Sequence, residues 1–480
     1  MNYSIIFNII GWVIKVEGFL MLFPALVALI YKENNIGIFF GCAAVYYAVG
    51  KLLTLKNPKD SRFYAREGFV AVALSWVVMS ILGAIPFIIS GEIPSCIDAV
   101  FEIVSGFTTT GASILVDVEA LSHSMLFWRS FSHWIGGMGV LVFILAILPM
   151  AGGQNIYLIK AESTGPEVGK FVPKLQKTAG YLYIIYVAMS LIQLVLLLAG
   201  NMPLFDAICD VFGSAGTGGF GIKADSMAGY STYIQMITAL FMFLFGINFN
   251  FYFLLISKRL RAALGMEEVK WYVIIYVVAV VSIVFNLWKA TGVVGINVKD
   301  AIFQVSSIMT STGYATTDFN KWPEFSRYII CVLMFIGACT GSTGGGMKVA
   351  RFIIYFKQIG KQIGFLIHPR SVKIIRMNGK KLEHDTVRIV NTYLLVYIFI
   401  FAISMLILSI DNFDLITTFT AVSATFNNIG PGLNMVGPTG NFFEFSVLSK
   451  IVMIFDMLAG RLEIFPLLVL MTPTTWRRNG

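Results

Sequence analysis

Long stretches of this chain are apolar and carry no charged side chain. Five of them cover residues 69–91, 130–159, 178–205, 227–257 and 271–288. Two more open the chain at about 5–31, where Lys15 and Glu17 interrupt, and at about 34–50. A helix needs about 20 predominantly apolar residues to cross the hydrocarbon core of a membrane, and buried helices of soluble proteins are shorter. The pattern therefore predicts a helical protein with about ten membrane-spanning segments.

A shorter polar motif recurs between these stretches. An Asp-Ala pair opens a segment, and a glycine follows 13 residues after the aspartate. The three pairs are Asp98 with Gly111, Asp206 with Gly219, and Asp300 with Gly313. A fourth segment starts at Asp414, but its glycine, Gly430, lies 16 residues on. This difference predicts a three-residue insertion or a longer helix in the fourth segment.

Each segment is too short to cross a membrane and suits a half-helix of about three turns. The aspartate is a favourable N-terminal residue, and the negative C-terminal end of such a half-helix favours a cation at mid-membrane. We therefore predict an all-α membrane protein with four helix–pore-loop–helix repeats around one pore, plus two N-terminal helices. The expected boundaries are 1–55 for the N-terminal helices and 56–160, 161–260, 261–365 and 366–480 for the repeats.

The residues at the end of each segment suit a dehydrated monovalent cation. Backbone carbonyls replace the water around such an ion where the chain is extended, and glycine permits the dihedral angles required. The predicted filter residues are Thr109, Thr110, Gly111, Thr217, Gly218, Gly219, Ser311, Thr312, Gly313, Asn428, Ile429 and Gly430. Phe220 and Tyr314 directly follow two of the glycines, and we expect them to brace the loops.

Composition and charge agree with a membrane protein. Hydrophobic residues make up 57% of the chain and charged residues 13%, whereas a soluble domain carries about 25% charged residues. The net charge is +9, and 25 of the 35 Lys and Arg residues lie in segments 51–67, 158–177, 258–270, 348–388 and 477–478. These segments alternate with the apolar stretches as cytoplasmic loops do. A basic face with interleaved aromatic residues is lacking, so no nucleic-acid partner is expected.

Several motifs together resemble the TrkH-type membrane subunits of the Trk/Ktr/HKT superfamily of potassium transport proteins. The filter-like motifs are FTTTGAS (107–113), TGGFG (217–221), TSTGYA (310–315) and NNIGPG (427–432). The helix motifs are WRSFSHWIGGMG (128–139), GSTGGGMK (341–348) and GRLEIFPLLVL (460–470). The resemblance runs through nearly the whole chain. It implies potassium uptake through a carbonyl-lined filter in the cytoplasmic (inner) membrane of a bacterium or archaeon.

The resemblance also assigns a gate. The implied gate residues are Gly341, Ser342, Thr343, Gly344, Gly345, Gly346, Lys348 and Arg461. In the family the glycine-rich stretch forms an intramembrane loop under the filter, and its composition here agrees, since consecutive small residues break a helix. A phosphate-binding loop does not fit, because the lysine is one residue too far from the last glycine and no strand precedes the motif. The family places an arginine at 461 as an electrostatic barrier to ions, whereas the residues alone also fit an ion pair with Asp456 or Glu463.

Further expectations concern partners and the outer side of the molecule. By resemblance, the protein is a homodimer in contact with membrane lipid, bound to a cytosolic TrkA-like ring of regulatory subunits that bind nucleotides, either NAD or ATP/ADP. K⁺ is the transported ion, and no organic cofactor is expected in this chain. Acidic residues such as Glu102 and Asp210 are expected at an outer mouth that concentrates cations. Arg129 is expected near the outer interface.

Two alternatives to potassium uptake stay open. A sodium-conducting relative commonly has serine in place of a filter glycine, and all four glycines are present here. A cation-coupled symporter is not distinguished by the sequence. A transporter built from inverted repeats would alternate the orientation of its units, whereas every unit here has its basic loop on the same side. An enzyme is not expected, because no nucleophile–base set or metal-ligand spacing is found.

Overall fold

The computed structural model describes residues 1–55, 64–139, 175–292, 295–370 and 373–476. Helices make up most of this part and nearly all of its regular secondary structure, and its two short strands, β1 (Arg376–Met377) and β2 (Lys380–Lys381), form an antiparallel hairpin. The predicted all-α class is confirmed. Most of the apolar stretch 130–159, most of the basic segment 158–177, the basic segment 477–478 and the expected boundaries at 55/56 and 160/161 lie outside the described residues.

Six described spans are long and apolar enough to cross a membrane. They are α1 (Tyr3–Leu20) continued by α2 (Leu22–Tyr31), α3 (Ile36–Thr54), α4 (Ala65–Ser90), α9 (Leu175–Ala199), α14 (Glu267–Thr291) and α18 (His384–Leu408). The expected number was about ten. Part of the difference lies in the apolar stretch 227–257, which is bent by 89° between two helices and is not one long helix. Most of the stretch 130–159 lies outside the described residues.

A short helix follows each of the last four spans. These short helices, which the sequence analysis predicts as pore helices and which keep that name below, are α5 (Cys96–Phe107), α10 (Leu204–Gly216), α15 (Gly295–Met309) and α19 (Leu415–Phe426). The predicted insertion in the fourth segment is wrong. Asp414 is the N-cap of α19, whereas Asp98 and Asp206 lie three residues after the N-caps Ser95 and Pro203. Counted from the N-cap, the glycine lies 16 residues on in all three helices (95 to 111, 203 to 219, 414 to 430).

A second helix returns from each pore loop and stops early. These helices are α6 (His123–Gly137), α11 (Thr232–Phe245), α16 (Glu324–Phe335) and α20 (Val447–Arg461). After α11 the chain bends by 89° into α12 (Phe249–Ile256), which leads to α13 (Leu260–Leu264). After α16 it is non-helical until α17 (Val349–Ile367), and after α20 it turns into α21 (Phe465–Met471) and α22 (Pro473–Trp476). Short 3-10 turns lie at Phe319–Lys321, Ser409–Asp411 and Asn434–Val436.

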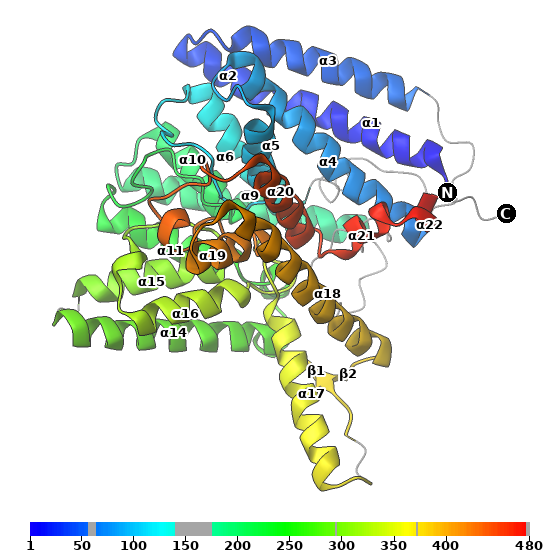
Figure 1. Cartoon of the computed structure of the whole chain (residues 1–480), viewed down its shortest axis with the longest axis vertical. Coiled ribbons are helices and arrows are strands. Elements are labelled where there is room, and N and C mark those ends of the chain that lie inside the picture. Colours follow the sequence, from blue (N-terminus) through cyan, green and yellow to red (C-terminus); the bar gives the residue numbers. More distant parts are fainter. Residues whose placement is uncertain (56–63, 140–174, 293–294, 371–372, 477–480) are drawn as a thin grey trace.

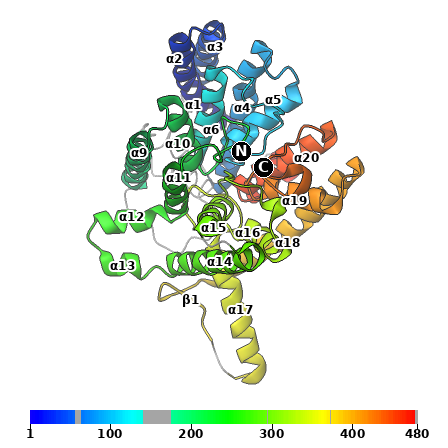
Figure 2. The same ribbon diagram turned by 90° about the vertical axis from the view of Figure 1, so that its left-hand side faces the viewer.

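The four groups of helices close a ring. We call α4–α6 unit 1, α9–α11 unit 2, α14–α16 unit 3 and α18–α20 unit 4. The second helix of each unit packs on the pore helix of the next, in the pairs α6–α10, α11–α15, α16–α19 and α20–α5. Figures 1 and 2 show α1 and α3 outside this ring, beside α4, and α17 projecting away from the body with the β1–β2 hairpin. The loops between pore helices and second helices therefore meet at the centre.

Candidate functional site: a ring of four loops above a glycine-rich break

The four loops that follow the pore helices share one unusual backbone conformation. The first residue of each, Thr109, Thr217, Ser311 and Asn428, has φ between 54° and 58°. The third residue of each, Gly111, Gly219, Gly313 and Gly430, has φ between 69° and 95°. A left-handed conformation costs a non-glycine residue of order 1–3 kcal/mol, so it persists only where the surroundings enforce it. All four loops are held in the same strained form.

The loops also share one hydrogen-bond register. The N–H of the middle residue donates to the carbonyl five residues earlier, at the end of the pore helix, and the distance is 2.8 Å each time. The bonds run from Thr110 to Ser105, Gly218 to Gly213, Thr312 to Ser307 and Ile429 to Ala424. This bond fixes each loop against its own helix. The predicted filter residues therefore occupy equivalent positions in all four units.

The glycines touch the neighbouring loops in cyclic order. A Cβ atom added to any of the four glycines would meet a backbone carbonyl oxygen of the next loop. The pairs are Gly111 with the oxygen of Gly218, Gly219 with that of Thr312, Gly313 with that of Ile429, and Gly430 with that of Thr110. The oxygen of Thr110 lies 2.8 Å from where a Cβ of residue 430 would be, so no side chain fits there. The structure thus brings the four loops, which contain all twelve predicted residues, together in one closed ring.

Oxygen atoms dominate this ring, and the side chains add to the carbonyls. The hydroxyls of Thr108 and Thr110 lie 2.8 Å apart, and the Asn428 amide donates to Thr110 Oγ1 at 2.9 Å. Thr109 Oγ1 and Asn428 Oδ1 are buried and lack a hydrogen-bond partner among the described residues. Hard alkali cations bind oxygen, so this donor set fits a monovalent metal ion.

Phe220 and Tyr314 lie behind the ring. The Tyr314 hydroxyl lies 3.4 Å from the carbonyl of Asp210 and 3.5 Å from that of Phe220, so it connects loop 3 with pore helix and loop 2. The Phe220 ring packs against α6 of unit 1. Both aromatic side chains are 1% exposed, and both join adjacent units.

The glycine-rich stretch of the sequence is a break between α16 and α17. Its peptide groups bond across to a second break, between α11 and α12: Cys339 N–H donates to Gly246 O, and Phe249 N–H to Gly341 O, each at 3.0 Å. The Gly345 N–H donates to the hydroxyl of Ser311 at 2.6 Å. The stretch therefore lies directly against the first residue of the predicted filter loop of unit 3, called loop 3.

Charged residues hold the two ends of this break. The ammonium group of Lys348 donates to the carbonyls of Gly344 and Gly345. The Glu268 carboxylate accepts from the N–H groups of Thr340 at 2.6 Å and Ala350 at 3.2 Å. Glu268 thus fixes the start of the break and caps α17, a role that sequence reasoning missed because the partners lie more than 70 residues apart.

Arg461 lies at the end of α20 and is 7% exposed. Its guanidinium group donates to the carbonyl oxygens of Thr343 at 2.7 Å, of Gly137 at 2.7 Å, and of Gly136. The expected ion-pair partners are engaged elsewhere in the described structure: Glu463 pairs with Arg351, and Asp456 accepts from Ser404 at 2.8 Å. Arg461 thus joins unit 4, the break in unit 3 and the end of α6 in unit 1.

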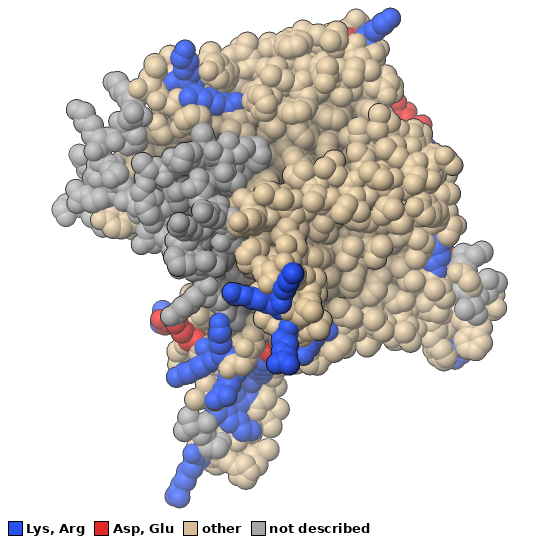
Figure 3. All heavy atoms as spheres, turned by 180° about the vertical axis from the view of Figure 1, so that it is seen from behind, with Lys and Arg blue, Asp and Glu red and all other residues tan. Residues whose placement is uncertain are grey.

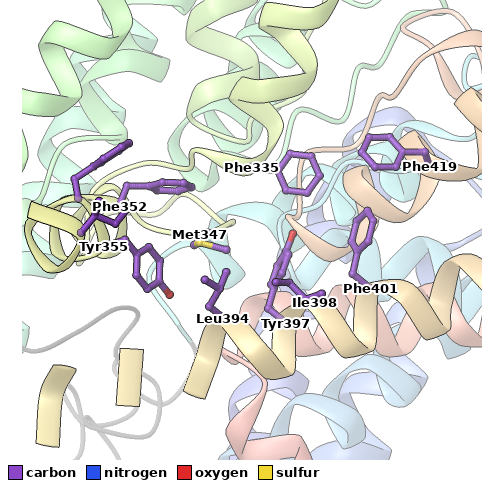
Figure 4. Close-up of a pocket in the computed structure, with 11 residues that line it drawn as sticks. Phe335, Met347, Phe352, Tyr355, Leu394, Tyr397, Ile398, Phe401 and Phe419 are labelled. Carbon is purple, nitrogen blue, oxygen red and sulfur yellow. The ribbon is translucent and has the colours of Figure 1, made fainter. Parts of the chain in front are cut away.

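An apolar pocket of about 490 Å³ lies on the other side of the break. Figure 4 shows Met347 at its centre, between Phe352 and Tyr355 of α17 and Leu394 and Tyr397 of α18. The break therefore contacts loop 3 through polar groups and lines an apolar pocket through Met347.

Arg129 and two of the acidic residues expected at an outer mouth, Glu102 and Asp210, are buried among the helices and do not face open solvent. Arg129 is 2% exposed and forms an ion pair with Glu102, 2.6 Å from its Nε and 0% exposed. Asp210 is 4% exposed and accepts from Thr238 at 2.9 Å. Each of these polar contacts joins the short helix of a unit to the second helix of the same unit.

Comparison with known proteins gives matches over essentially the full length. Residues 37–477 match the TrkH family, described as a cation transport protein. The Trk system potassium uptake protein TrkH of Salmonella typhimurium strain LT2 is 37% identical over 99% of this chain and 100% of its own length. TrkG of Escherichia coli K12, another Trk system potassium uptake protein, is 31% identical over 99% of each chain. The crystal structure of the potassium transporter TrkH from Vibrio parahaemolyticus superposes with a TM-score of 0.88, at 34% identity, over 99% of this chain and 100% of that one.

Proposed function

Because this chain belongs to the TrkH family of cation transport proteins, we propose that it takes up potassium ions through the ring of four loops. The membership predicted from the sequence motifs is confirmed, and the chain is a multi-pass protein of the cytoplasmic membrane. The observation that carries the proposal is the cyclic contact between each glycine and the next loop's carbonyl. Four equivalent loops in one chain give a complete ring without a second copy.

The chemistry of the ring suits potassium. An ion that enters the filter loses water, and inward-facing carbonyls of residues such as Thr110 and Gly111 replace it. The C-terminal ends of the four pore helices point toward the same region and add a favourable negative potential. The unpartnered oxygens of Thr109 and Asn428 supply further ligands at the inner end of the filter.

The break between α16 and α17 acts as the gate in this proposal. It lies under loop 3, its backbone is non-helical, and Lys348 and Arg461 place two cationic groups beside it. The pocket beside Met347 gives it volume into which it can move. Residues 341–346 obstruct the pathway when the bonds to Ser311 and Arg461 are made, and ions pass when those bonds break.

Partners of the gate belong to the same proposal. The protein is a homodimer surrounded by membrane lipid, and a cytosolic TrkA-like ring that binds NAD or ATP/ADP docks below it. Figure 3 shows Lys and Arg side chains gathered on the projecting part of the molecule, which contains α17 and the hairpin. Lys361, Arg376, Lys380 and Lys381 belong to this region. A basic projection continuous with the gate suits a regulatory subunit with an acidic contact face.

Ion flux into liposomes that contain the purified protein tests the transport proposal. We expect K⁺ and Rb⁺ to enter much faster than Na⁺, and a strain without potassium uptake systems to grow on low potassium when it expresses the protein. Equal or faster Na⁺ entry would support the sodium-conducting alternative. Potassium accumulation driven by an imposed Na⁺ or proton gradient alone would support symport. Liposomes with the Gly313→Ser variant provide the control for filter-dependent flux.

A further inference from the structure

One position on the second helices distinguishes unit 1 from the other three units. The second helices begin after the N-caps Ser122, Ser231, Pro323 and Ser446. Eleven residues after the cap, the residues are His133, Met242, Met334 and Met457. All four side chains are at most 1% exposed. Three units therefore have methionine at a buried position where unit 1 has histidine.

The filter loop of the next unit differs in a matching way. Unit 1 packs on unit 2, and the middle residue of loop 2 is Gly218, whereas loops 1, 3 and 4 have Thr110, Thr312 and Ile429 there. A Cβ at residue 218 would overlap the imidazole ring of His133, with Cε1 only 2.5 Å away. The ring thus occupies the space that a side chain of loop 2 would need. The histidine and the glycine form a complementary pair.

His133 also bonds to the backbone on both sides. Its Nδ1 lies 2.7 Å from the carbonyl oxygen of Gly106, in the pore helix of unit 1, and its Nε2 lies 3.3 Å from the backbone nitrogen of Phe220. A carbonyl only accepts and a backbone N–H only donates, so Nδ1 carries the proton and Nε2 accepts. Methionine at this position makes neither bond.

The imidazole is one half of a clamp around Phe220. The Phe220 ring lies 4.2 Å from the His133 ring and 3.5 Å from the guanidinium carbon of Arg129, one turn earlier on α6. Arg129 donates to the carbonyl of Gly221 at 2.8 Å and pairs with Glu102 of the pore helix. Four contacts therefore hold the exit of loop 2 against unit 1.

We propose that His133 is a positioning residue for the second filter loop. It fills the space left by Gly218. Through its bond to the Phe220 N–H it also orients the carbonyl of Gly219, which lies in the same peptide plane as that N–H. The inference rests on the proposed filter function. The pairing of His133 with Gly218 explains how loop 2, with two consecutive glycines and no side chain at its middle position, keeps the same hydrogen-bond register as the other three loops.

Substitutions at residues 218 and 133 test whether the His133 ring fills the space that a side chain at residue 218 would need. Gly218→Thr alone should lower the K⁺/Na⁺ flux ratio by about tenfold, the factor that corresponds to about 1.4 kcal/mol. Gly218→Thr combined with His133→Met recreates the pairing of the other units and should recover most of that ratio and of the melting temperature. A double variant no better than Gly218→Thr in either measurement would overturn the proposal. The melting temperature keeps the test informative if a variant conducts no ions.

Two amide variants test the hydrogen bond. Gln at 133 carries its amide near the position of Nε2 and retains an acceptor for Phe220, whereas Asn carries its amide near Nδ1 and does not. We expect His133→Gln to retain the wild-type ion ratio better than His133→Asn, with His368→Gln and His368→Asn on the exposed end of α17 as matched controls. Equal ratios for the two variants contradict the positioning role. The proposed function fails separately: it is contradicted if the wild-type protein itself does not prefer K⁺ over Na⁺. The positioning role is tested only by how the K⁺/Na⁺ flux ratio changes from wild type to variant.

Discussion

The hydroxyl of Ser311 accepts a hydrogen bond from the backbone N–H of Gly345 at 2.6 Å. Ser311 is the first residue of filter loop 3, and Gly345 lies in the break of the second helix of the same unit. The same hydroxyl donates to the carbonyl of Thr310 at 2.6 Å, so it acts both as a hydrogen-bond acceptor and as a donor. The proposed filter and the proposed gate are therefore joined by one bond, and the break cannot move away without losing it.

Replacement of Ser311 by alanine should favour the open state of the gate. The bond contributes about 1 kcal/mol net, so its loss should raise K⁺ flux through purified protein in liposomes by about fivefold. The K⁺/Na⁺ ratio should stay unchanged, because the backbone carbonyl of residue 311 remains. Ser311→Thr is the matched control, since Thr109 and Thr217 occupy the same position in units 1 and 2. Unchanged flux in the alanine variant would argue against a gate at this contact.

Gly313→Ser should weaken the preference for potassium over sodium. Residue 313 has φ of 88°, and its missing side chain faces the Ile429 carbonyl and, at 2.9 Å, the ring of Pro431. A side chain there displaces the neighbouring carbonyl, and we expect a loss of about tenfold in the K⁺/Na⁺ flux ratio. Gly91→Ser is the matched control, because Gly91 has φ of 76° and no atom within 4 Å of its Cβ direction. Equal losses in both variants would mean that backbone strain, rather than filter geometry, is measured.

Local patterns were sufficient to predict the helical class and the four loops. Apolar length identified the spans, and Gly111, Gly219, Gly313 and Gly430 marked loops because a left-handed backbone at that position requires glycine. These signals lie within a few residues of one another. The fourth unit shows their limit: Asp414 and Asp98 are both favourable at a helix start but occupy different positions of it, so alignment by aspartate implied an insertion.

Contacts between residues far apart in the sequence were not predictable in this way. Arg461 binds carbonyls more than 100 residues away, and Glu463, expected as its partner, pairs with Arg351. Arg129 was expected at an interface because its local sequence resembles a helix start near water, yet Glu102 and Phe220 enclose it. Such pairings depend on which helix faces meet in the ring, and neither periodicity nor composition contains that information. The matched residues His133 and Gly218 left a weak signal in the sequence, a filter loop with an extra glycine.

The cap of the fourth pore helix contributes to stability. The Asp414 carboxylate accepts from the N–H of Thr417 at 3.1 Å and from its hydroxyl. Asp414→Ala should destabilise the protein by about 1 kcal/mol, measured as a lower melting temperature in detergent at pH 7. Asp414→Asn is the control, because asparagine is also a favourable N-cap. A melting temperature of the alanine variant equal to wild type would contradict the role of the cap.

The same cap predicts a pH dependence. The side-chain hydrogen bond from Thr417 lowers the pKa of Asp414 below its ordinary value. A carboxylate with a lowered pKa stabilises the folded state above its unfolded pKa, about 3.9, and this contribution is lost as the pH falls through the folded pKa. The difference in melting temperature between wild type and Asp414→Ala should therefore be constant from pH 5 to pH 8 and shrink below about pH 4. A difference that stays constant at acidic pH would exclude a charge-dependent cap.

Arg461 combines a charge and a set of hydrogen bonds, and two substitutions separate them. Arg461→Ala removes both, and we expect higher K⁺ flux with an unchanged K⁺/Na⁺ ratio because the filter loops are untouched. If repulsion by the charge limits flux, the effect is large: a unit charge about 8 Å from an ion costs that ion about 2 kcal/mol at an effective dielectric constant of about 20, which corresponds to a roughly thirtyfold increase in flux when the charge is removed. Wild-type flux in a stably folded Arg461→Ala protein would exclude a barrier.

Arg461→Lys retains the charge, but an ammonium group lacks the planar fork that reaches the carbonyls of Thr343 and Gly137 together. If repulsion of the ion limits flux, the lysine variant stays as slow as wild type. If the hydrogen bonds hold the break in place, the lysine variant conducts as fast as the alanine variant. The melting temperature of each purified variant shows whether a loss of folding, rather than of the barrier, explains its flux. The geometry favours the second outcome, because the guanidinium group contacts the break through Thr343 and anchors it to the end of α6.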